Sequence, residues 1–187
     1  MDNELLEIRW HGRGGQGAVT SAELIALAAI NEGKYAQALP SFGAERRGAP
    51  VLAFNRISET HSIRIRAEVE EPDIVVVFDP GLLQVINVAS GLKEDGVIII
   101  NTRKSPQEMK SKLGLKRRLA TVDANKIARE ILGVPIVNTT MVGALVKVTE
   151  VVKLESLVEP LKHRFGTLAE RNIQAMKAAY EQITVEG

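Results

Sequence analysis

Runs of apolar residues alternate with mixed polar and apolar stretches along the chain, and together they predict a series of strands and helices. Residues 74–78 and 97–100 are continuously apolar, as strands buried on both faces of a parallel sheet require. Residues 51–57 and 61–66 are expected to pair as a hairpin that turns through residues 58–60. Other strands are predicted where apolar and polar residues alternate, at residues 5–11, 35–39 and 118–122.

Helices are predicted between the strands and after the last of them. Residues 17–31 are rich in Ala, Leu and Ile, and Gly33 follows them as a typical helix stop. Residues 105–108 form a capping box with proline at the first helical position, and residues 167–170 form a second capping box. Further helices are predicted at residues 82–89, 124–132, 139–151, 154–165 and 168–183.

This alternation of strands and helices predicts an α/β fold. We expect a Rossmann-like, largely parallel sheet with flanking helices, an internal hairpin and C-terminal helices. The sequence shows no repeat, low-complexity tract or linker, so residues 1–187 are expected to form a single domain. A chain of this length buries about 70% of its unfolded surface, enough for a core without disulfides or metals.

The charge balance and the absence of cysteine exclude several functions. Lys plus Arg number 24 and Asp plus Glu number 23, so the basic excess of a nucleic-acid-binding protein is missing. Without cysteine the chain has no disulfide, no Cys-ligated zinc or iron–sulfur cluster and no thiol nucleophile. The acidic residues 1–4 do not resemble an export signal, and no apolar run reaches the length of a membrane span. We therefore expect a soluble, cytoplasmic protein that binds neither nucleic acid nor membranes.

A glycine-rich loop, residues 12–17, lies between the first predicted strand and the first predicted helix and matches the pattern G-x-G-x-x-G. Glycines permit positive φ and close backbone approach, and the N-terminus of the following helix offers free amides to a phosphate. The alternative is that the glycines only pack the first helical turn against a neighbouring chain. The candidate residues for an anion or cofactor site are Gly12, Arg13, Gly14, Gly15, Gln16 and Gly17.

A complete NAD(P) site is not expected, because its ribose-binding residue is missing. In dinucleotide-binding folds an Asp or Glu ends the second strand, about 20 residues after the glycines. Here that strand ends with residues 37–40, Gln-Ala-Leu-Pro, which offer neither a carboxylate for NAD nor a basic residue for the NADP phosphate. The residues alone therefore predict an anion-binding α/β fold without a complete dinucleotide site.

A long polar loop, residues 40–50, is bounded by two prolines and contains Arg46 and Arg47. From Ser41 to Arg66 the only basic side chains apart from His61 are arginines, whose planar guanidinium suits carboxylates and phosphates. Arg46 and Arg47 are therefore candidate contacts to an anionic ligand or to a partner chain. The alternative is a rigid interface loop in which a neighbouring carboxylate pairs with one of the arginines.

Polar or glycine residues stand where four predicted strands end. Ligands of open α/β sheets bind outside the carboxyl ends of the strands, so these residues could rim one crevice. Asp79 and Asp123 are also well placed to cap the helices that follow them, which is the alternative interpretation. The four residues are Gly12, Asp79, Asn101 and Asp123.

No catalytic residue and no metal ligand is predicted on this chain. His11, His61 and His163 are scattered and have no metal-ligand spacing with other residues. The sequence has neither a G-x-S-x-G nucleophile motif nor a Walker loop. Residues 103–118 are strongly basic, which fits either a docking surface for an acidic protein or polyanion, or a solvated helix face.

Two long motifs, HGRGGQGAVT at residues 11–20 and YAQALPSFGAERRGAP at residues 35–50, resemble the γ subunits of 2-oxoacid:ferredoxin oxidoreductases, the pyruvate enzyme in particular. The chain departs from that family's pattern at Thr140, where proline is expected. The resemblance covers nearly the whole chain and continues through residues 72–79, 96–102 and 138–145.

The resemblance implies a subunit of an enzyme that oxidatively decarboxylates a 2-oxo acid to acyl-CoA and CO₂ and reduces ferredoxin. It implies that thiamine diphosphate, Mg²⁺ and iron–sulfur clusters reside on other subunits, that coenzyme A (CoA) is a co-substrate, and that this chain packs over the active site and helps to enclose CoA. The isolated chain is then expected to be inactive. The alternative is a stand-alone nucleotide-binding protein, either a regulator or a dehydrogenase fragment.

Overall fold

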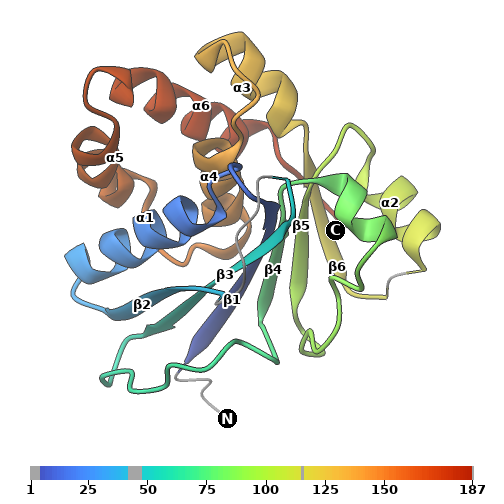
Figure 1. Ribbon diagram of the computed structural model, residues 1–187, viewed down its shortest axis with the longest axis horizontal. Helices are drawn as coiled ribbons and strands as arrows, with labels where there is room; N and C mark the ends of the chain where they lie inside the picture. The colour runs from blue at the N-terminus through green and yellow to red at the C-terminus, as the bar shows by residue number, and fades with distance from the viewer. Residues whose placement is uncertain (1–4, 42–47, 115, 187) are drawn as a thin grey trace.

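The structure is a computed structural model that describes residues 5–41, 48–114 and 116–186. Within these residues, seven strands form one sheet in the order β2-β3-β1-β4-β5-β6-β7 (Figure 1). The strands β1, β4, β5 and β6 are parallel, whereas β3 and β7 run antiparallel to their neighbours. The strands are β1 Leu6–Arg13, β2 Tyr35–Pro40, β3 Pro50–Ser58, β4 Ile74–Val77, β5 Val97–Asn101, β6 Arg118–Val122 and β7 Thr184–Val185.

The internal hairpin is present, but it is made by other residues than predicted. β2 and β3 are its two arms, with Tyr35 opposite Ser58 and Pro40 opposite Ala53. Residues 61–66, the predicted second arm, contain no strand and are mostly exposed. Both edges of β3 are already occupied, one by β2 and the other by β1 along its whole length, so no edge is left for a further strand.

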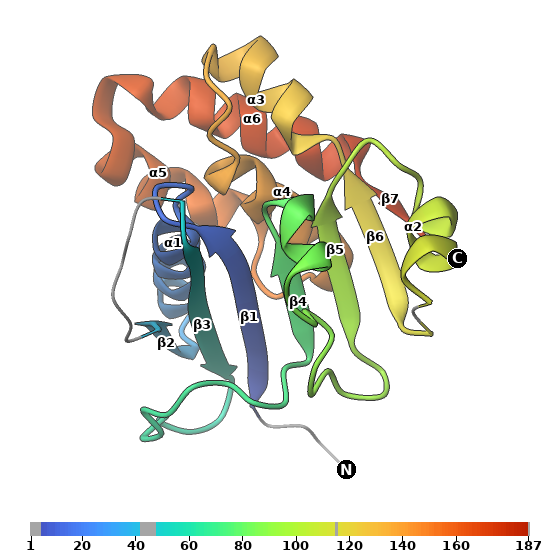
Figure 2. The same ribbon diagram turned by 45° about the vertical axis from the view of Figure 1, so that its right-hand side comes forward.

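Helices cover the two faces of the sheet unequally (Figures 1 and 2). On one face α1 packs beside α4 and α5, while α6 packs against α3, α4 and α5. On the other face α2 lies near β6. No helix in the described part of the chain is long and apolar enough to cross a membrane. The helices are α1 Ala18–Asn31, α2 Pro106–Leu113, α3 Ala124–Leu132, α4 Asn138–Thr149, α5 Val158–Phe165 and α6 Ala169–Gln182, with 3₁₀ turns η1 Pro80–Gln84, η2 Leu154–Leu157 and η3 Gly166–Leu168.

One of the two predicted capping boxes is confirmed. At the start of α2 the Ser105 hydroxyl accepts from the Glu108 amide at 3.3 Å, and the Glu108 carboxylate accepts from the Ser105 amide at 2.8 Å. The second capping box is wrong, because α6 follows Leu168 without a side-chain cap. Thr167 already lies inside η3, so its backbone does not have the extended conformation of a capping residue.

The helix predicted at residues 82–89 is also wrong. Only the short turn η1 forms there, and Asp79 caps it by accepting from the Gly81 amide at 2.8 Å. The Asn87 side chain then accepts from the Ala89 amide at 3.2 Å. Such a local bond between an Asn side chain and the backbone competes with helical hydrogen bonding, so the chain turns instead of continuing the helix.

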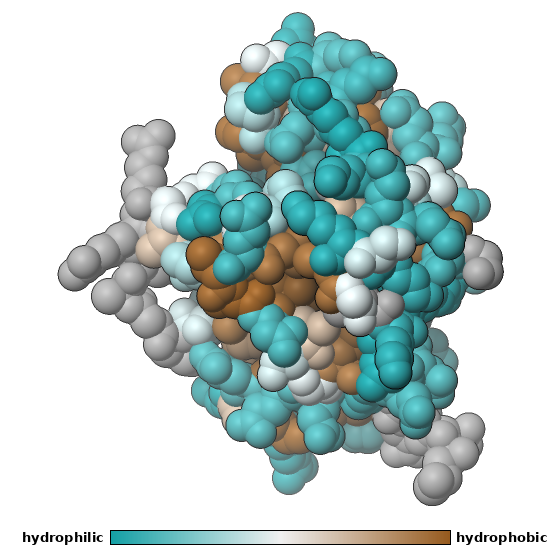
Figure 3. Space-filling model, turned by 90° about the vertical axis from the view of Figure 1, so that its right-hand side faces the viewer, coloured by the Kyte–Doolittle hydropathy of each residue, from teal (hydrophilic) through white to brown (hydrophobic). Residues whose placement is uncertain are grey.

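The face of the sheet that carries α2 is not covered along its whole width. Val75, Val77, Ile98 and Ile100 form a small apolar cluster there. Over β1 and β3 the same face carries a cavity lined by side chains of both strands. Figure 3 looks at the side of the molecule with α2 and shows a hollowed hydrophobic area surrounded by hydrophilic side chains.

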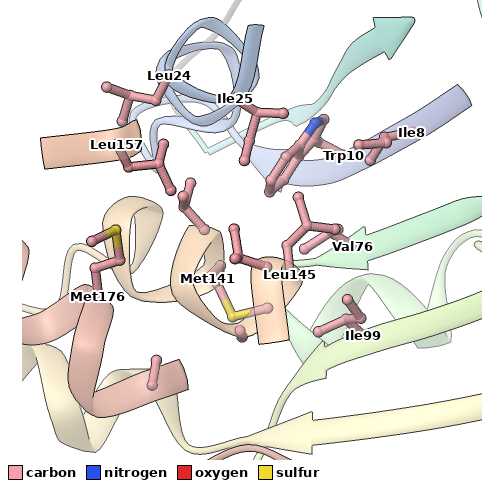
Figure 4. Packing of buried hydrophobic residues seen from close by; sticks show 14 of the residues in the cluster. Ile8, Trp10, Leu24, Ile25, Val76, Ile99, Met141, Leu145, Leu157 and Met176 are labelled. Carbon is pink, nitrogen blue, oxygen red and sulfur yellow. The ribbon is translucent and has the colours of Figure 1, made fainter. Parts of the chain in front are cut away.

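The main core lies between the opposite face of the sheet and helices α1, α4 and α6 (Figure 4). Trp10 of β1 is fully buried in it, beside Ile25 of α1 and Leu145 of α4. The indole meets the ring of Phe78 edge to face at a centroid distance of 5.9 Å, and its N–H donates to the Asn55 side chain at 2.8 Å. The polar atom of this large side chain is therefore satisfied inside the core.

Candidate functional site

The parallel strands end side by side at one edge of the sheet. His11 of β1 pairs with Val77 of β4, which pairs with Ile100 of β5, and the next pair is Asn101 with Val122 of β6. The residues predicted to rim a crevice stand at or directly after these strand ends. This edge therefore carries Gly12, Asp79, Asn101 and Asp123.

Asn101 and Asp123 stabilise the segments that meet at this edge. The Asn101 side chain donates to the carbonyl of Phe78 at 2.8 Å and accepts from the amide of Asn125 at 3.3 Å, so it links β4, β5 and α3. Asp123 caps α3 by accepting from the amide of Lys126 at 3.0 Å. Capping, the alternative interpretation of Asp123, is thus confirmed, and both side chains serve the fold.

Arg13 joins three segments at this edge. Its Nε donates to Asp79 Oδ2 at 2.5 Å, and its Nη1 donates to the carbonyl of Gly48 at 3.1 Å. The Asp79 side chain also caps η1, so both of its oxygens are engaged. The Arg13 side chain keeps 31% of its surface exposed, so it is only partly buried by these contacts.

The glycine-rich loop, residues 12–17, is a compact turn bonded to the end of the long polar loop of residues 40–50, which we call the arginine-rich loop. The amide of Gln16 donates to the carbonyl of Arg13 at 2.9 Å, and the Gln16 side chain accepts from the Arg13 amide at 2.7 Å. Gly14 donates to the carbonyl of Ala49 at 2.9 Å and accepts from the Gly48 amide at 3.3 Å. The structure thus brings the two sequence motifs together at one place through their described residues.

The packing of the glycine-rich loop against the start of α4 requires a glycine at position 17. Gly17 adopts φ +83°, and a Cβ added there would lie 2.9 Å from the Cβ of Asn138 at the start of α4. Ser21 reinforces this contact, because its hydroxyl donates to the carbonyls of Gly17 and Asn138 at 3.1 and 3.2 Å. At Gly15, by contrast, φ is +93° and a Cβ would meet no described atom within 4 Å. The close approach at Gly17 is therefore to α4, whereas Gly15 serves the turn and has no described atom close to it.

The N-terminus of α1 is the part of this edge that best suits an anion. This helix of 14 residues has Gly17 as N-cap, no side-chain cap and no acidic residue in its first turn. Its first amides and its dipole therefore favour a negative group. Arg164 of α5 lies close by, with Nη2 donating to the Thr20 hydroxyl at 3.1 Å.

The strand order also argues against a dinucleotide. In a Rossmann fold the second strand lies beside the first, and its end delivers the ribose-binding carboxylate to the glycine loop. Here β3 is inserted between β1 and β2. The end of β2 at Pro40 is thus one strand further away from the glycine loop, in addition to lacking a carboxylate.

Some predicted residues cannot be placed. Arg46 and Arg47, and Glu45 beside them, lie outside the described residues. Among the described residues there is no group of three or more His, Asp or Glu side chains that could hold a metal ion. The donor set of this chain therefore does not fit an iron–sulfur cluster, which needs thiolate ligands that the sequence lacks.

A buried pair, Arg9 and His11, was not predicted as a unit. Arg9 Nε donates to His11 Nε2 at 3.1 Å, on the face of the sheet that carries the cavity. Burial, together with the charge of Arg9, lowers the pKa of His11 to about 3, so the imidazole is neutral at physiological pH. The signal was present in the strand itself, where Glu7, Arg9 and His11 alternate with apolar residues.

The sheet order and the flanking helices define an α/β protein of the Rossmann-like class. The family model for pyruvate ferredoxin/flavodoxin oxidoreductases matches residues 7–182, and the chain belongs to this family. The common γ subunit of the pyruvate/ketoisovalerate oxidoreductases of Pyrococcus furiosus is 54% identical over 183 residues, which are 97% of this chain and 98% of the relative.

Solved structures show the same fold. The crystal structure of pyruvate oxidoreductase subunit PORC from Thermotoga maritima has a TM-score of 0.88 and 39% identity, covering 99% of this chain and 100% of that one. The 2-oxoglutarate:ferredoxin oxidoreductase from Magnetococcus marinus, solved with 2-oxoglutarate, coenzyme A and succinyl-CoA bound, has a TM-score of 0.77. This match has 20% identity over 96% of this chain and 32% of that one, and it shows the fold alone.

Proposed function

We propose that this chain is the γ subunit of a 2-oxoacid:ferredoxin oxidoreductase, with pyruvate as its principal substrate. Such an enzyme converts the 2-oxo acid to acyl-CoA and CO₂ and reduces ferredoxin. The observation that carries the proposal is the 54% identity to a γ subunit over nearly the full length of both chains. A stand-alone dinucleotide-binding protein is disfavoured, because β2 ends without a carboxylate and is separated from β1 by β3.

In this proposal the chemistry resides on partner subunits, which hold thiamine diphosphate with Mg²⁺ and the iron–sulfur clusters. Thiamine diphosphate supplies the carbanion stabilisation that decarboxylation needs. This chain has no cysteine for a cluster and, among its described residues, no group of carboxylates and histidines for a metal. The contribution of this chain is therefore to bind and orient CoA and to help enclose it.

The CoA-facing surface of this chain is the edge formed by the N-terminus of α1, Arg13 and the arginine-rich loop. CoA carries phosphate esters, which suit the uncapped helix N-terminus and arginine side chains. The bonds of Gly14 to Gly48 and Ala49 hold the end of the arginine-rich loop against the glycine loop. Arg46 and Arg47, which lie outside the described residues, are further candidate contacts to CoA or to a partner subunit.

Purification of the native complex through a tag on this chain tests the assignment. We expect partner chains that carry thiamine and clusters, and pyruvate-dependent dye reduction that requires CoA. A panel of 2-oxo acids then ranks the substrates. The isolated chain should give no turnover with thiamine diphosphate, Mg²⁺ and CoA present. A chain that is purified alone with a bound nucleotide would support the alternative function instead.

Alanine substitutions of Arg46 and Arg47 test the CoA contact within the intact complex. Loss of one charge-assisted hydrogen bond, about 1.5–3 kcal/mol, raises the apparent KM for CoA roughly tenfold to a hundredfold and leaves decarboxylation nearly intact. Arg64→Ala is the matched control, because Arg64 is an exposed arginine that belongs neither to the glycine-rich loop nor to the arginine-rich loop. An unchanged KM for CoA in both variants would refute the contact, and loss of the complex would identify an interface instead.

A further inference from the structure

A groove runs between helix α2 and the segment of residues 80–89, which follows β4. Two adjoining hollows of about 400 and 250 Å³ form it, and Leu83 and Gln84 line both of them. The groove lies on the side of the molecule that carries α2, where Figure 3 shows a hydrophobic hollow surrounded by hydrophilic side chains. The proposed function assigns no role to this surface.

The larger hollow is an apolar surface that is open to solvent. None of its lining side chains is charged, and the large apolar ones are Leu83, Val85, Ile86 and Val88, together with a leucine of α2. Val85 is 64% exposed, the largest exposed fraction among the large apolar side chains of residues 5–41, 48–114 and 116–186. A single exposed apolar residue is ordinary, but contiguous apolar walls in a groove indicate a surface that another molecule covers.

The smaller hollow brings positive charge to the other end of the groove. Its only charged lining residues are Lys104 and Lys112. In the described part of the chain neither lysine has a carboxylate within 4.0 Å, whereas Lys110, which lies between them in the sequence, pairs with Glu186 at 2.7 Å. The two lysines therefore offer unpaired positive charge beside an apolar groove.

Glu108 is the only acidic residue among residues 103–118, and it is already engaged. Its Oε2 accepts from the amide and the hydroxyl of Ser105 at 2.8 and 2.9 Å. Seven basic side chains stand against it in this segment, although the whole chain has 24 basic and 23 acidic residues. The rest of the chain is thus net acidic, and the positive charge gathers around α2, where it attracts a negatively charged surface.

We propose that this groove docks an acidic, amphipathic segment of a partner subunit of the oxidoreductase. Apolar side chains of the segment cover Leu83 and Val85, and its carboxylates face Lys104 and Lys112. The inference rests on the proposed function, because it takes the occupant from the complex. The apolar walls favour a permanent partner over a transient electron acceptor, since permanent interfaces are the more hydrophobic ones. They also disfavour a nucleic acid, whose phosphates contact basic side chains alone.

Zero-length cross-linking of the purified complex with a carbodiimide tests this proposal, because the reagent joins a lysine amine to a carboxylate in direct contact with it. Mass spectrometry then identifies the linked residues. We expect links from Lys104 or Lys112 to Asp or Glu residues of a partner subunit. Lys177 of α6 is exposed and has no ion pair among the described residues, so it sets the background. Links only within this chain, to a second copy of it or to added ferredoxin would each contradict the proposal.

Substitutions at the two ends of the groove separate charge from apolar contact. Lys104→Glu combined with Lys112→Glu should weaken assembly about tenfold at about 0.15 M salt and less at about 1 M salt, because salt screens exposed charges. Val85→Asp should weaken assembly at both salt concentrations, because it buries a carboxylate under the partner. Lys177→Glu is the matched control for a reversed charge and should leave assembly unchanged. Size-exclusion chromatography over a dilution series measures assembly, and thermal unfolding of the free chain checks that these exposed substitutions leave the fold intact.

Failure of this inference can be told apart from failure of the proposed function. If the tagged chain is purified without partner subunits, both are wrong. If an active complex forms but Lys104 and Lys112 give no more links than Lys177, the function stands and the docking site is wrong. Normal assembly of the double lysine variant and of Val85→Asp would overturn the site as well. A raised KM for CoA with normal assembly would assign the lysines to CoA and refute the docking.

Discussion

Replacing Gly17 with alanine measures how tightly the glycine loop is built into its own chain. Alanine at φ +83° has to adopt a left-handed conformation, which costs about 1–2 kcal/mol. Its Cβ would also stand 2.9 Å from the Cβ and Nδ2 of Asn138, closer than real side chains approach. Overpacking of this kind typically costs another 1–3 kcal/mol, on the order found for core substitutions. We expect Gly17→Ala to lower the free energy of unfolding by about 2–5 kcal/mol.

Gly15→Ala is the matched control for the packing part of this cost. Gly15 has φ +93°, but a Cβ there would meet no described atom within 4 Å, so only the backbone cost of about 1–2 kcal/mol remains. Asn138→Gly removes the side-chain atoms that the new methyl group would meet. In that background Gly17→Ala should cost no more than Gly15→Ala does in the native chain. The coupling energy of this double-mutant cycle therefore isolates the contact between α1 and α4.

Urea unfolding of these variants and the native chain, followed by circular dichroism, gives the free energies. Thermal unfolding gives a second measure, because about 1 kcal/mol shifts the Tm of a chain of this size by about 2–4 °C. Gly17→Ala should thus lower the Tm by roughly 4–20 °C. If Gly17→Ala costs no more than Gly15→Ala, or if Asn138→Gly gives no relief, packing on α4 is not the reason for this glycine. A ligand contact would then be the better explanation.

Three further perturbations follow from particular contacts. Burial and the charge of Arg9 lower the pKa of His11 from 6.5 to about 3, so between these pH values the unfolded chain binds a proton that the native chain does not. Above the unfolded pKa the ring is neutral in both states and its titration does not affect stability, whereas below it the free energy of unfolding falls with pH, by about 2 kcal/mol at pH ~5. The difference between native and His11→Gln unfolding curves at about pH 7.5 and about pH 5 should show it, and parallel curves would contradict it. Thr140→Val removes a buried hydroxyl without a partner among the described residues and should raise the free energy of unfolding by about 1 kcal/mol, whereas a lower Tm would show that the hydroxyl is satisfied. Arg13→Ala breaks the ion pair with Asp79 and should cost about 1–2 kcal/mol at low salt and less at about 1 M salt, and a salt-independent cost would refute the ionic contribution.

The central elements could be predicted because local signals and tertiary packing agree there. The apolar runs of β4 and β5 are buried at every position, as a strand covered on both faces must be. The capping box of α2 is readable because all of its partners lie within four residues. The glycine loop could be placed because it stands between a strand and a helix that are both strongly patterned.

Pairing between strands could not be predicted in the same way. Residues 51–57 form a clear strand, but the sequence does not tell which neighbours take its two edges. The nearest segment, residues 61–66, was the natural choice, whereas β2 and β1 occupy both edges. The helix expected at residues 82–89 failed for a similar reason. An Asn87 side chain that bonds to the backbone leaves no trace in the apolar pattern.

The alternating polar residues of β1 are a sequence signal for buried polar contacts on one face of this strand. A central strand of a covered sheet should be apolar at every position, as β4 and β5 are. β1 instead carries Glu7, Arg9 and His11 at alternate positions, so either this face meets solvent or polar partners are buried with it. The structure shows the second case for Arg9 and His11, which are buried and bonded to each other. A polar face on a central strand thus indicates that partners outside the strand complete it, and here they are the backbone carbonyls of Val69, Glu70, Val88 and Ser90, which accept from Arg9.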